Sequence, residues 1–173
     1  MSTRYLIISP ILVVLLFAAT LASAQGTPKL PSHAHAAADT AASQNVPVEA
    51  QAAATVVDQF GTALQAGDLK AVELLLDPEV LILESGGAER SRQEYLSHHA
   101  VGDAKFLKEA HVQLLRRTAG RSGDLVWVGS ESEIHFQKEG KPITLLSTET
   151  MVLKNVSRSW RIVHIHWSSR PQK

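Results

Sequence analysis

The sequence predicts an α+β domain in which helices come first and a meander of antiparallel strands comes last. Two observations support this fold class. Apolar residues recur at helical spacing between residues 47 and 76, whereas segments rich in β-branched and aromatic residues dominate after residue 111. Short turns separate these later segments, and short connections imply antiparallel neighbours. We therefore expect N-terminal helices packed on a curved, mainly antiparallel sheet.

Two helices are expected at the start of this domain. Pro47 suits the first turn of a helix, and Gly67 is placed to end that helix in a left-handed conformation. Asp68 can cap a second, shorter helix, which the pair Asp77-Pro78 stops. A short strand is then expected over residues 80–83.

A third helix is predicted to begin at a capping box. The hydroxyl of Ser91 and the carboxylate of Glu94 can each satisfy an amide that the opening turn leaves free. The helix carries Tyr95 and the pair His98-His99, and Glu94 lies one turn before His98 on the same face. Asp103 is expected to cap one further helical turn.

Four strands should follow, and the last of them is the most informative. The strands are expected over residues 112–118, 125–137, 143–154 and 160–168. Side chains alternate between the two faces of a strand. Strict alternation in the last strand places Ile162, His164, His166 and Ser168 on one face, and Val163, Ile165 and Trp167 on the other. Two histidines therefore project side by side from one element.

The N-terminus has the pattern of a secretory signal peptide over residues 1–24. Arg4 supplies a positive charge, residues 6–21 are almost wholly apolar, and Ala22-Ser23-Ala24 is a small-x-small cleavage site. We expect cleavage after Ala24 and a periplasmic or secreted protein without a membrane segment. An uncleaved membrane anchor is the alternative.

Two further regions complete the domain organisation. Residues 25–46 are rich in Ala, Ser, Pro and Thr and are expected to form a disordered linker, and residues 47–170 form the folded domain.

The chain contains no cysteine, which excludes disulfides and thiolate chemistry. Its 17 basic and 17 acidic residues balance, without a sustained basic patch, so nucleic-acid binding is not expected.

The order of these elements resembles the nuclear transport factor 2-like superfamily, in its SnoaL-like branch. The resemblance lies in the first helix with Phe60 and Gly67-Asp68, and in the step from helix to strand at residues 77–80. It extends to the last two strands, residues 147–154 and 160–168, and covers nearly all of the folded domain.

This resemblance implies a cone whose sheet and helices enclose a pocket. Members include isomerases, dehydratases, epoxide hydrolases, polyketide cyclases and non-catalytic dimerisation modules, so the fold by itself does not decide the function. Catalytic members use an aspartate or a histidine–aspartate set. We interpret Asp58 and Asp68, on or beside the opening helices, as helix-surface and capping residues. A homodimer joined through the sheet is also expected, because the apolar side of the last strand needs cover.

His164 and His166 are the leading candidates for catalysis. Their Cα atoms should lie ~6.5–7 Å apart, so both imidazoles can reach one substrate or one ion. Histidine suits acid–base chemistry because its unperturbed pKa is about 6.5. The alternative is that both side chains hydrogen-bond a neighbouring strand and have no chemical role.

Other polar residues are candidates for contact with a ligand. A carboxylate beside either histidine would fix the tautomer of its ring, and Glu131, Glu133 and Glu149 lie on strands where this can occur. Ordinary surface charges are the alternative. The candidate ligand-binding residues are Glu84, Tyr95, His98, His99, Glu131, Glu133, Glu149 and Ser168.

No motif in the sequence calls for a cofactor. A metal ion is the alternative, and a mixed set of imidazoles and carboxylates suits zinc or copper. The candidate ligands for such an ion are Glu84, His98, His99, His164 and His166.

Three functions therefore compete. The first is an exported protein that binds a small apolar or amphipathic molecule in a conical pocket. The second is an acid–base enzyme, an isomerase, dehydratase or cyclase, with His164 or His166 as the base. The third is a metal-binding protein that uses the His/Glu set.

Overall fold

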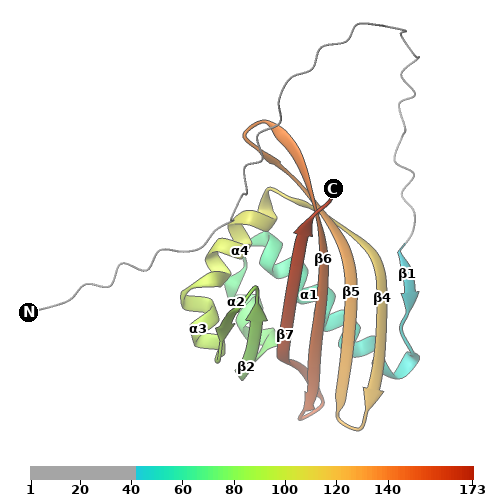
Figure 1. The fold of residues 1–173 in the computed structure, drawn as a ribbon. Coiled ribbons are helices and arrows are strands. Elements are labelled where there is room, and N and C mark those ends of the chain that lie inside the picture. The colour runs from blue at the N-terminus through green and yellow to red at the C-terminus, as the bar shows by residue number, and fades with distance from the viewer. Residues whose placement is uncertain (1–41) are drawn as a thin grey trace, which may run out of the picture. The chain divides into compact units, whose positions relative to one another are not determined.

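The computed structural model describes residues 42–173, so the predicted signal peptide and most of the predicted linker lie outside it. Within this range seven strands form one sheet in the order β1-β4-β5-β6-β7-β2-β3 (Figure 1). The strands are β1 (Ser43–Asn45), β2 (Leu76–Glu84), β3 (Gly87–Glu89), β4 (His111–Ser122), β5 (Leu125–Lys138), β6 (Lys141–Val156) and β7 (Ser159–Pro171). The helices are the short 3₁₀ turn η1 (Val48–Ala50), α1 (Gln51–Ala66), α2 (Leu69–Leu75), α3 (Arg92–Ser97) and α4 (His99–Lys108).

The helices lie on one face of the sheet. α1 crosses behind the long central strands, with α3 and α4 beside it (Figure 1). Strands β4 to β7 form the predicted antiparallel meander, whereas β2 joins β7, and β1 joins β4, in parallel. The predicted α+β class, with helices packed on a mainly antiparallel sheet, is confirmed.

Local sequence signals account for the helix ends. Gly67 ends α1 with φ of 73°, the left-handed conformation that glycine adopts at low cost. The Asp68 carboxylate caps α2 by accepting a hydrogen bond from the amide of Ala71 at 3.0 Å. Ser91 accepts from the amide of Glu94 at 3.1 Å, and Glu94 accepts from the amide of Arg90 at 2.7 Å. The capping box thus forms, but the Glu94 carboxylate accepts from the amide of Arg90, one residue before the Ser91 amide that the motif predicts.

Several element boundaries differ from the prediction. The predicted third helix ends at Ser97, so that His99 begins α4. α2 ends at Leu75, and β2 runs from Leu76 through the Asp77-Pro78 pair, because Leu76 already pairs with Ile162 of β7. Asp103 lies within α4 instead of capping it, since α4 begins at His99. β1, within the predicted linker, belongs to the sheet because it pairs in parallel with β4.

The inner face of the sheet has an apolar base. One register row joins Ala119, Val128, Met151 and Ile165, and the next row joins Val126, Leu153 and Ile162. All of these residues are buried, and they form one core with Val57, Phe60 and Leu64 of α1. This core holds α1 at a fixed height above the strands.

A bulge in β7 overturns the strict alternation predicted for the last strand. The pairing of β6 with β7 shifts between Val152 and Leu153, so that His164 is opposite Val152 and Ile162 is opposite Leu153. The extra residue puts Ile162 on the same inner face as Ile165, and both are fully buried. His164 and His166 are left on the outer face, away from the helices.

None of the helices between residues 42 and 173 is long and apolar enough to cross a bilayer.

Candidate functional site

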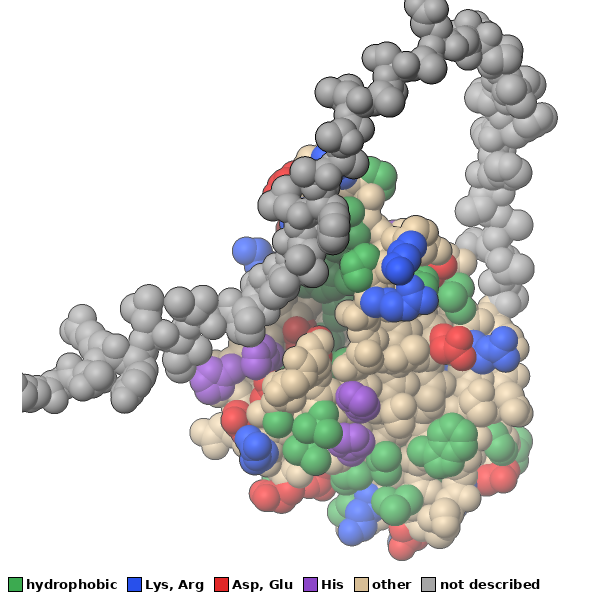
Figure 2. All heavy atoms as spheres, viewed as in Figure 1, with side chains coloured by type: hydrophobic (Ala, Val, Ile, Leu, Met, Phe, Trp, Pro, Cys, Tyr) green, Lys and Arg blue, Asp and Glu red, His purple; other side chains and the backbone are tan. Residues whose placement is uncertain are grey.

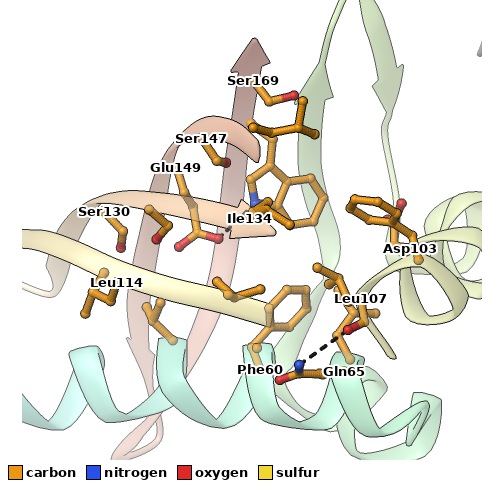
Figure 3. A pocket seen from close by; sticks show the side chains of 18 of the residues that line it. Phe60, Gln65, Asp103, Leu107, Leu114, Ser130, Ile134, Ser147, Glu149 and Ser169 are labelled. Carbon is orange, nitrogen blue, oxygen red and sulfur yellow. Dashed lines mark hydrogen bonds between the residues drawn. The ribbon is translucent and has the colours of Figure 1, made fainter. Parts of the chain in front are cut away.

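A cavity of about 400 Å³ opens between helices α1 and α4 and the inner face of strands β4 to β7 (Figure 3). Its helix side is apolar and includes Phe60 and Leu64 of α1 with Phe106 and Leu107 of α4. The side chain of Gln65 ties the two helices together by donating to the carbonyl oxygens of Leu107 and Ala110, at 3.3 and 3.2 Å. The volume is that of a small-molecule pocket.

The floor of the cavity is a polar row that crosses the sheet. Arg117 of β4 is opposite Ser130 of β5, which is opposite Glu149 of β6, which is opposite Trp167 of β7. Glu84 of β2 continues the row beside Trp167. The row lies next to the apolar base of the sheet, so the hydrophobic core ends at this row and the cavity begins there.

One end of this floor is an ion pair. Arg117, of which 7% is exposed, donates through Nη1 to Oδ1 of Asp58 on α1, and through Nε to the hydroxyl of Ser130 at 3.3 Å. A shift in the β4–β5 register between Leu114 and Arg116 turns both Leu114 and Arg117 inward. Strict alternation along β4 would place Leu114 and Arg117 on opposite faces of the sheet. Because of the register shift, the Arg117 guanidinium reaches the cavity floor.

Glu149 occupies the centre of the floor. Trp167 donates a hydrogen bond from Nε1 to Oε2 of Glu149 at 2.8 Å (Figure 3). Burial raises the pKa of the Glu149 carboxyl, while Trp167, Arg117 and Ser130 act in the opposite direction. The site thus holds a recessed carboxyl group that favours its protonated form more than an exposed glutamate does.

A second row, nearer the cavity mouth, consists of hydroxyl groups. Ser132 of β5, Ser147 of β6 and Ser169 of β7 are opposite one another in the sheet, with Leu114 of β4 at the end of the row. All four line the cavity. These small side chains leave room above the sheet and offer both donors and acceptors along one wall.

The other end of the floor holds two carboxyl groups. The hydroxyl of Tyr95 donates to Oδ2 of Asp103 at 2.9 Å. Burial raises the pKa of Asp103, whereas the hydrogen bond from Tyr95 and the charge of His99 lower it. Burial and repulsion from Asp103 raise the pKa of Glu84. The pKa of Tyr95 is also raised, mainly by burial, so this hydroxyl remains a donor.

Aromatic rings separate the two ends. The indole of Trp167 stacks on Phe60 with ring centroids 6.3 Å apart, and it lies 6.2 Å from the ring of Tyr95. Phe106 of α4 meets Phe136 of β5 edge to face, at 5.1 Å, near the mouth. The contacts with Phe60 and Tyr95 fix the indole that holds Glu149.

The model of the SnoaL-like domain family matches residues 53–171 of this chain. The chain belongs to the SnoaL-like domain family. A crystal structure from Shewanella frigidimarina NCIMB 400, described as a putative ketosteroid isomerase, is 36% identical, with 68% of this chain and 94% of that chain covered and a TM-score of 0.65. A comparison with curated proteins found no significant match.

More distant structures share the fold of this SnoaL-like domain. A structure from Xanthomonas campestris, described as a putative calcium/calmodulin dependent protein kinase II association domain, is 22% identical, covering 76% of this chain and 96% of that one, with a TM-score of 0.61. An NTF2-like protein from Streptomyces avermitilis, described as a putative dehydratase, is 16% identical, covering 70% of this chain and 96% of that one, with a TM-score of 0.58. The family model and the Shewanella frigidimarina structure confirm the predicted superfamily, and these more distant structures show the shared fold alone.

The cavity of the SnoaL-like domain includes several of the predicted ligand-binding residues. Glu84, Glu149 and Ser168 line it. Tyr95 is fully buried behind the wall, where it orients Asp103. Ser168 also borders a second hollow on the outer face of the sheet, which Glu131 lines.

The remaining predicted carboxylates lie on the outer face. Glu131 pairs with Arg116 at 3.5 Å, and Glu133 pairs with His135 at 3.3 Å. Both face away from the helices because they alternate with the inward residues Ser130 and Ser132 along β5. Neither is near the cavity floor.

His164 and His166 do not line the cavity. Nδ1 of His164 lies 2.9 Å from the carbonyl oxygen of Leu81, and His166 is exposed opposite Thr150. The β7 bulge explains this placement, because it gives the inner face to Ile162, Ile165 and Trp167. A chemical role for the two histidines would have to lie on the outer face.

The predicted metal ligands are not brought together. Nδ1 of His98 lies 3.0 Å from the carbonyl oxygen of Glu94, and Nδ1 of His99 contacts the buried carboxylate of Glu89. His164 lies on the outer face, apart from Glu84 in the cavity. Within residues 42–173 no group of three or more such side chains is arranged to hold an ion.

The sequence reasoning missed Asp58, Arg117, Asp103 and Ser130. Asp58 is exposed on the helix surface, as expected, with 63% of its side chain accessible. It also pairs with Arg117, because it follows the buried Val57 and lies four residues after the buried Ala54, at the edge of the apolar face of α1. This helical spacing was the signal in the sequence that could have placed Asp58 beside the cavity. The position of Arg117 depends on a bulge, for which the sequence offered no comparable signal.

Proposed function

We propose that this SnoaL-like domain binds a small amphipathic molecule between α1, α4 and the sheet. The observation that carries the proposal is the two-sided cavity of about 400 Å³, apolar toward the helices and hydroxyl-rich toward the sheet. A ligand with an apolar skeleton and one polar edge matches both walls. The polar floor then sets its orientation through Glu149 and Arg117.

Filling the cavity tests this proposal. We expect Ser147→Leu to abolish the thermal stabilisation produced by library compounds that stabilise the wild type, because the larger side chain occupies the space above the serine row. Thr148→Leu, the next residue along β6 and exposed on the outer face, is the matched control. Binding that survives Ser147→Leu unchanged would contradict the location, and a wild type that binds no compound would contradict the function.

A second candidate function is acid–base catalysis of the isomerase or dehydratase type. The recessed carboxyl of Glu149 favours it, because a raised pKa suits a group that exchanges a proton near neutral pH. The 36% identity to the Shewanella frigidimarina protein points in the same direction. In this mechanism Glu149 moves the proton, and the guanidinium of Arg117, held in place by Asp58, stabilises the negative charge that develops on the substrate.

Turnover assays on the variants separate the two functions. If the domain is an enzyme of this kind, Glu149→Gln lowers kcat by about a hundredfold or more, while the binding of substrate persists. Glu131→Gln on the outer face is the control. The earlier prediction of a histidine base is tested by His164→Ala and His166→Ala, which should leave a carboxyl-based turnover unchanged.

We further propose that the domain forms a homodimer through the outer face of the sheet, and that it is exported. Solved structures of the same fold include association domains, which is compatible with self-assembly. Export rests on the signal pattern of residues 1–24. The intact mass of protein secreted or released from the periplasm should correspond to a chain that begins at Gln25.

A further inference from the structure

The polar lining of the cavity is strongly acidic. Carboxyl groups reach it from α1, β2, α4 and β6, through Asp58, Glu84, Asp103 and Glu149. Among the lining residues that the structure describes, Arg117 is the one cationic side chain. The cavity therefore presents far more hydrogen-bond acceptors and negative charge than positive charge to a bound molecule.

Arg117 is already committed to partners within the protein. Asp58 and Ser130 accept from its guanidinium, and its charge also acts on Glu149. An anionic ligand at Arg117 would lie beside the carboxyl groups of Asp58 and Glu149, whose negative charge opposes it. The ion pair thus disfavours acids at the one cationic side chain of the cavity lining.

The opposite end of the floor suits a cation. Glu84 and Asp103 both line the cavity there. Glu84 is opposite Trp167 in the sheet, and Tyr95, whose ring lies 6.2 Å from that indole, donates to Asp103. Tyr95 occupies only Oδ2 of Asp103, and the nearby His99 is held by Glu89. The side chain of Trp167, opposite Glu84 in the sheet, supplies an aromatic wall of the cavity beside it.

We propose that the ligand of this cavity is an amphipathic organic amine whose ammonium group lies between Glu84 and Asp103. This inference rests on the proposed small-molecule binding. An ammonium brings donors and positive charge to two acceptors that repel each other. Its apolar skeleton lies against Phe60 and Leu64, and the serine row receives any further polar substituent.

A matched series of probes tests the charge preference. The wild-type protein is titrated calorimetrically with an alcohol, a primary amine and a carboxylate on each of three skeletons: benzyl, naphthyl and adamantyl. We expect the amine to bind at least about fivefold more tightly than its alcohol, because a charge-assisted hydrogen bond replaces a neutral one. The carboxylate should bind most weakly on every skeleton.

Variants locate the effect. Glu84→Gln and Asp103→Asn should each reduce the preference for the amine over the alcohol toward unity, while the affinity for the alcohol stays within about twofold. Glu79→Gln, an exposed glutamate on the same strand as Glu84, is the control and should leave the preference unchanged. Thermal unfolding of each variant confirms that it is folded.

The outcomes separate this inference from the proposed function. Equal affinity for amine and alcohol, or tightest binding of the carboxylate, would overturn the amine assignment while small-molecule binding stands. A preference that survives in both Glu84→Gln and Asp103→Asn would overturn the proposed position of the ammonium. Failure of every probe to bind would contradict the inference and the proposed function together.

Discussion

Glu149 shows how a single residue acquires its properties from its neighbours. It lies at the centre of the cavity floor, where burial raises its pKa and the indole N–H of Trp167 holds one carboxylate oxygen at 2.8 Å. Because the folded-state pKa is raised above the unfolded value, protonated Glu149 favours the folded state. This contribution is complete below the ordinary pKa of 4.5 and is lost as pH rises through the folded-state pKa.

Replacing Glu149 with Gln should therefore weaken the pH dependence of stability. A glutamine cannot ionise, so the free energy of unfolding of Glu149→Gln should fall less than that of the wild type between pH ~5 and ~8. Urea denaturation at several pH values measures this. Glu131→Gln, whose carboxylate is exposed in a pair with Arg116, is the control. An unchanged pH profile would show that Glu149 is not recessed as described.

Trp167 stabilises the same carboxyl and can be tested by itself. Trp167→Phe retains an aromatic ring against Phe60 but removes the indole N–H, and we expect a loss of about 1–3 kcal/mol at neutral pH. Denaturation of Trp160→Phe, which changes another half-buried indole on β7, provides the comparison. If Trp167→Phe and Trp160→Phe lower the free energy of unfolding equally, at neutral pH and at acid pH alike, the hydrogen bond from Trp167 to Glu149 contributes nothing to stability.

At the scale of elements, two bulges and one capping box place the groups of the site. The bulge in β4 turns Arg117 inward, and the bulge in β7 turns His164 outward. The capping box at Ser91 starts α3, which delivers Tyr95 to Asp103. Each bulge is a local departure from regular pairing that decides which side chain reaches the cavity, whereas the capping box acts by fixing where α3 begins.

The capping box should be measurable as a stability effect. Ser91→Ala removes the oxygen that accepts from the amide of Glu94, and it should cost about 1 kcal/mol. Ser97→Ala removes another α3 hydroxyl, one that donates to the carbonyl oxygen of Glu94, and should cost less. Equal losses in urea denaturation would contradict a special role for the cap.

At the scale of the whole molecule, the helices leave the outer face of the sheet uncovered by any element between residues 42 and 173. Figure 2 shows hydrophobic and histidine side chains on this face. One outer row joins Trp127, Val152, His164 and Leu81, and the Trp127 side chain packs closely over Gly120. With 46% of Trp127 and 38% of Leu81 exposed, this row is a centre for the proposed homodimer.

A charge at the centre of that row should dissociate the dimer. Trp127→Glu is expected to raise the dimer dissociation constant at least about tenfold, because tryptophans contribute disproportionately to interfaces and a buried charge opposes association. Sedimentation equilibrium measures the change. Val101→Glu, at an exposed apolar position on α4, is the control. A wild type that is monomeric at micromolar concentration would refute the dimer.

The elements could be predicted from the sequence to a large extent, since local signals specify them. The roles of Gly67, Asp68 and Ser91 followed from capping chemistry, and the four antiparallel strands followed from composition and short turns. Among the candidate site residues, Glu84, Glu149 and Ser168 reach the cavity. The exact alternation in β7 could not be predicted, because an extra residue in a strand leaves no local mark in the sequence.

By itself, then, the sequence determined the fold class, several of the helix ends and the family, because capping, turn chemistry and periodicity act over a few neighbouring residues. The tertiary structure alone decided which polar residues share the cavity. Asp58, Arg117, Glu149 and Asp103 are far apart in the chain and meet only through the register of the sheet and the packing of α1 and α4. Register can shift by one residue at a bulge, and each such shift exchanges the inner and outer faces of a strand.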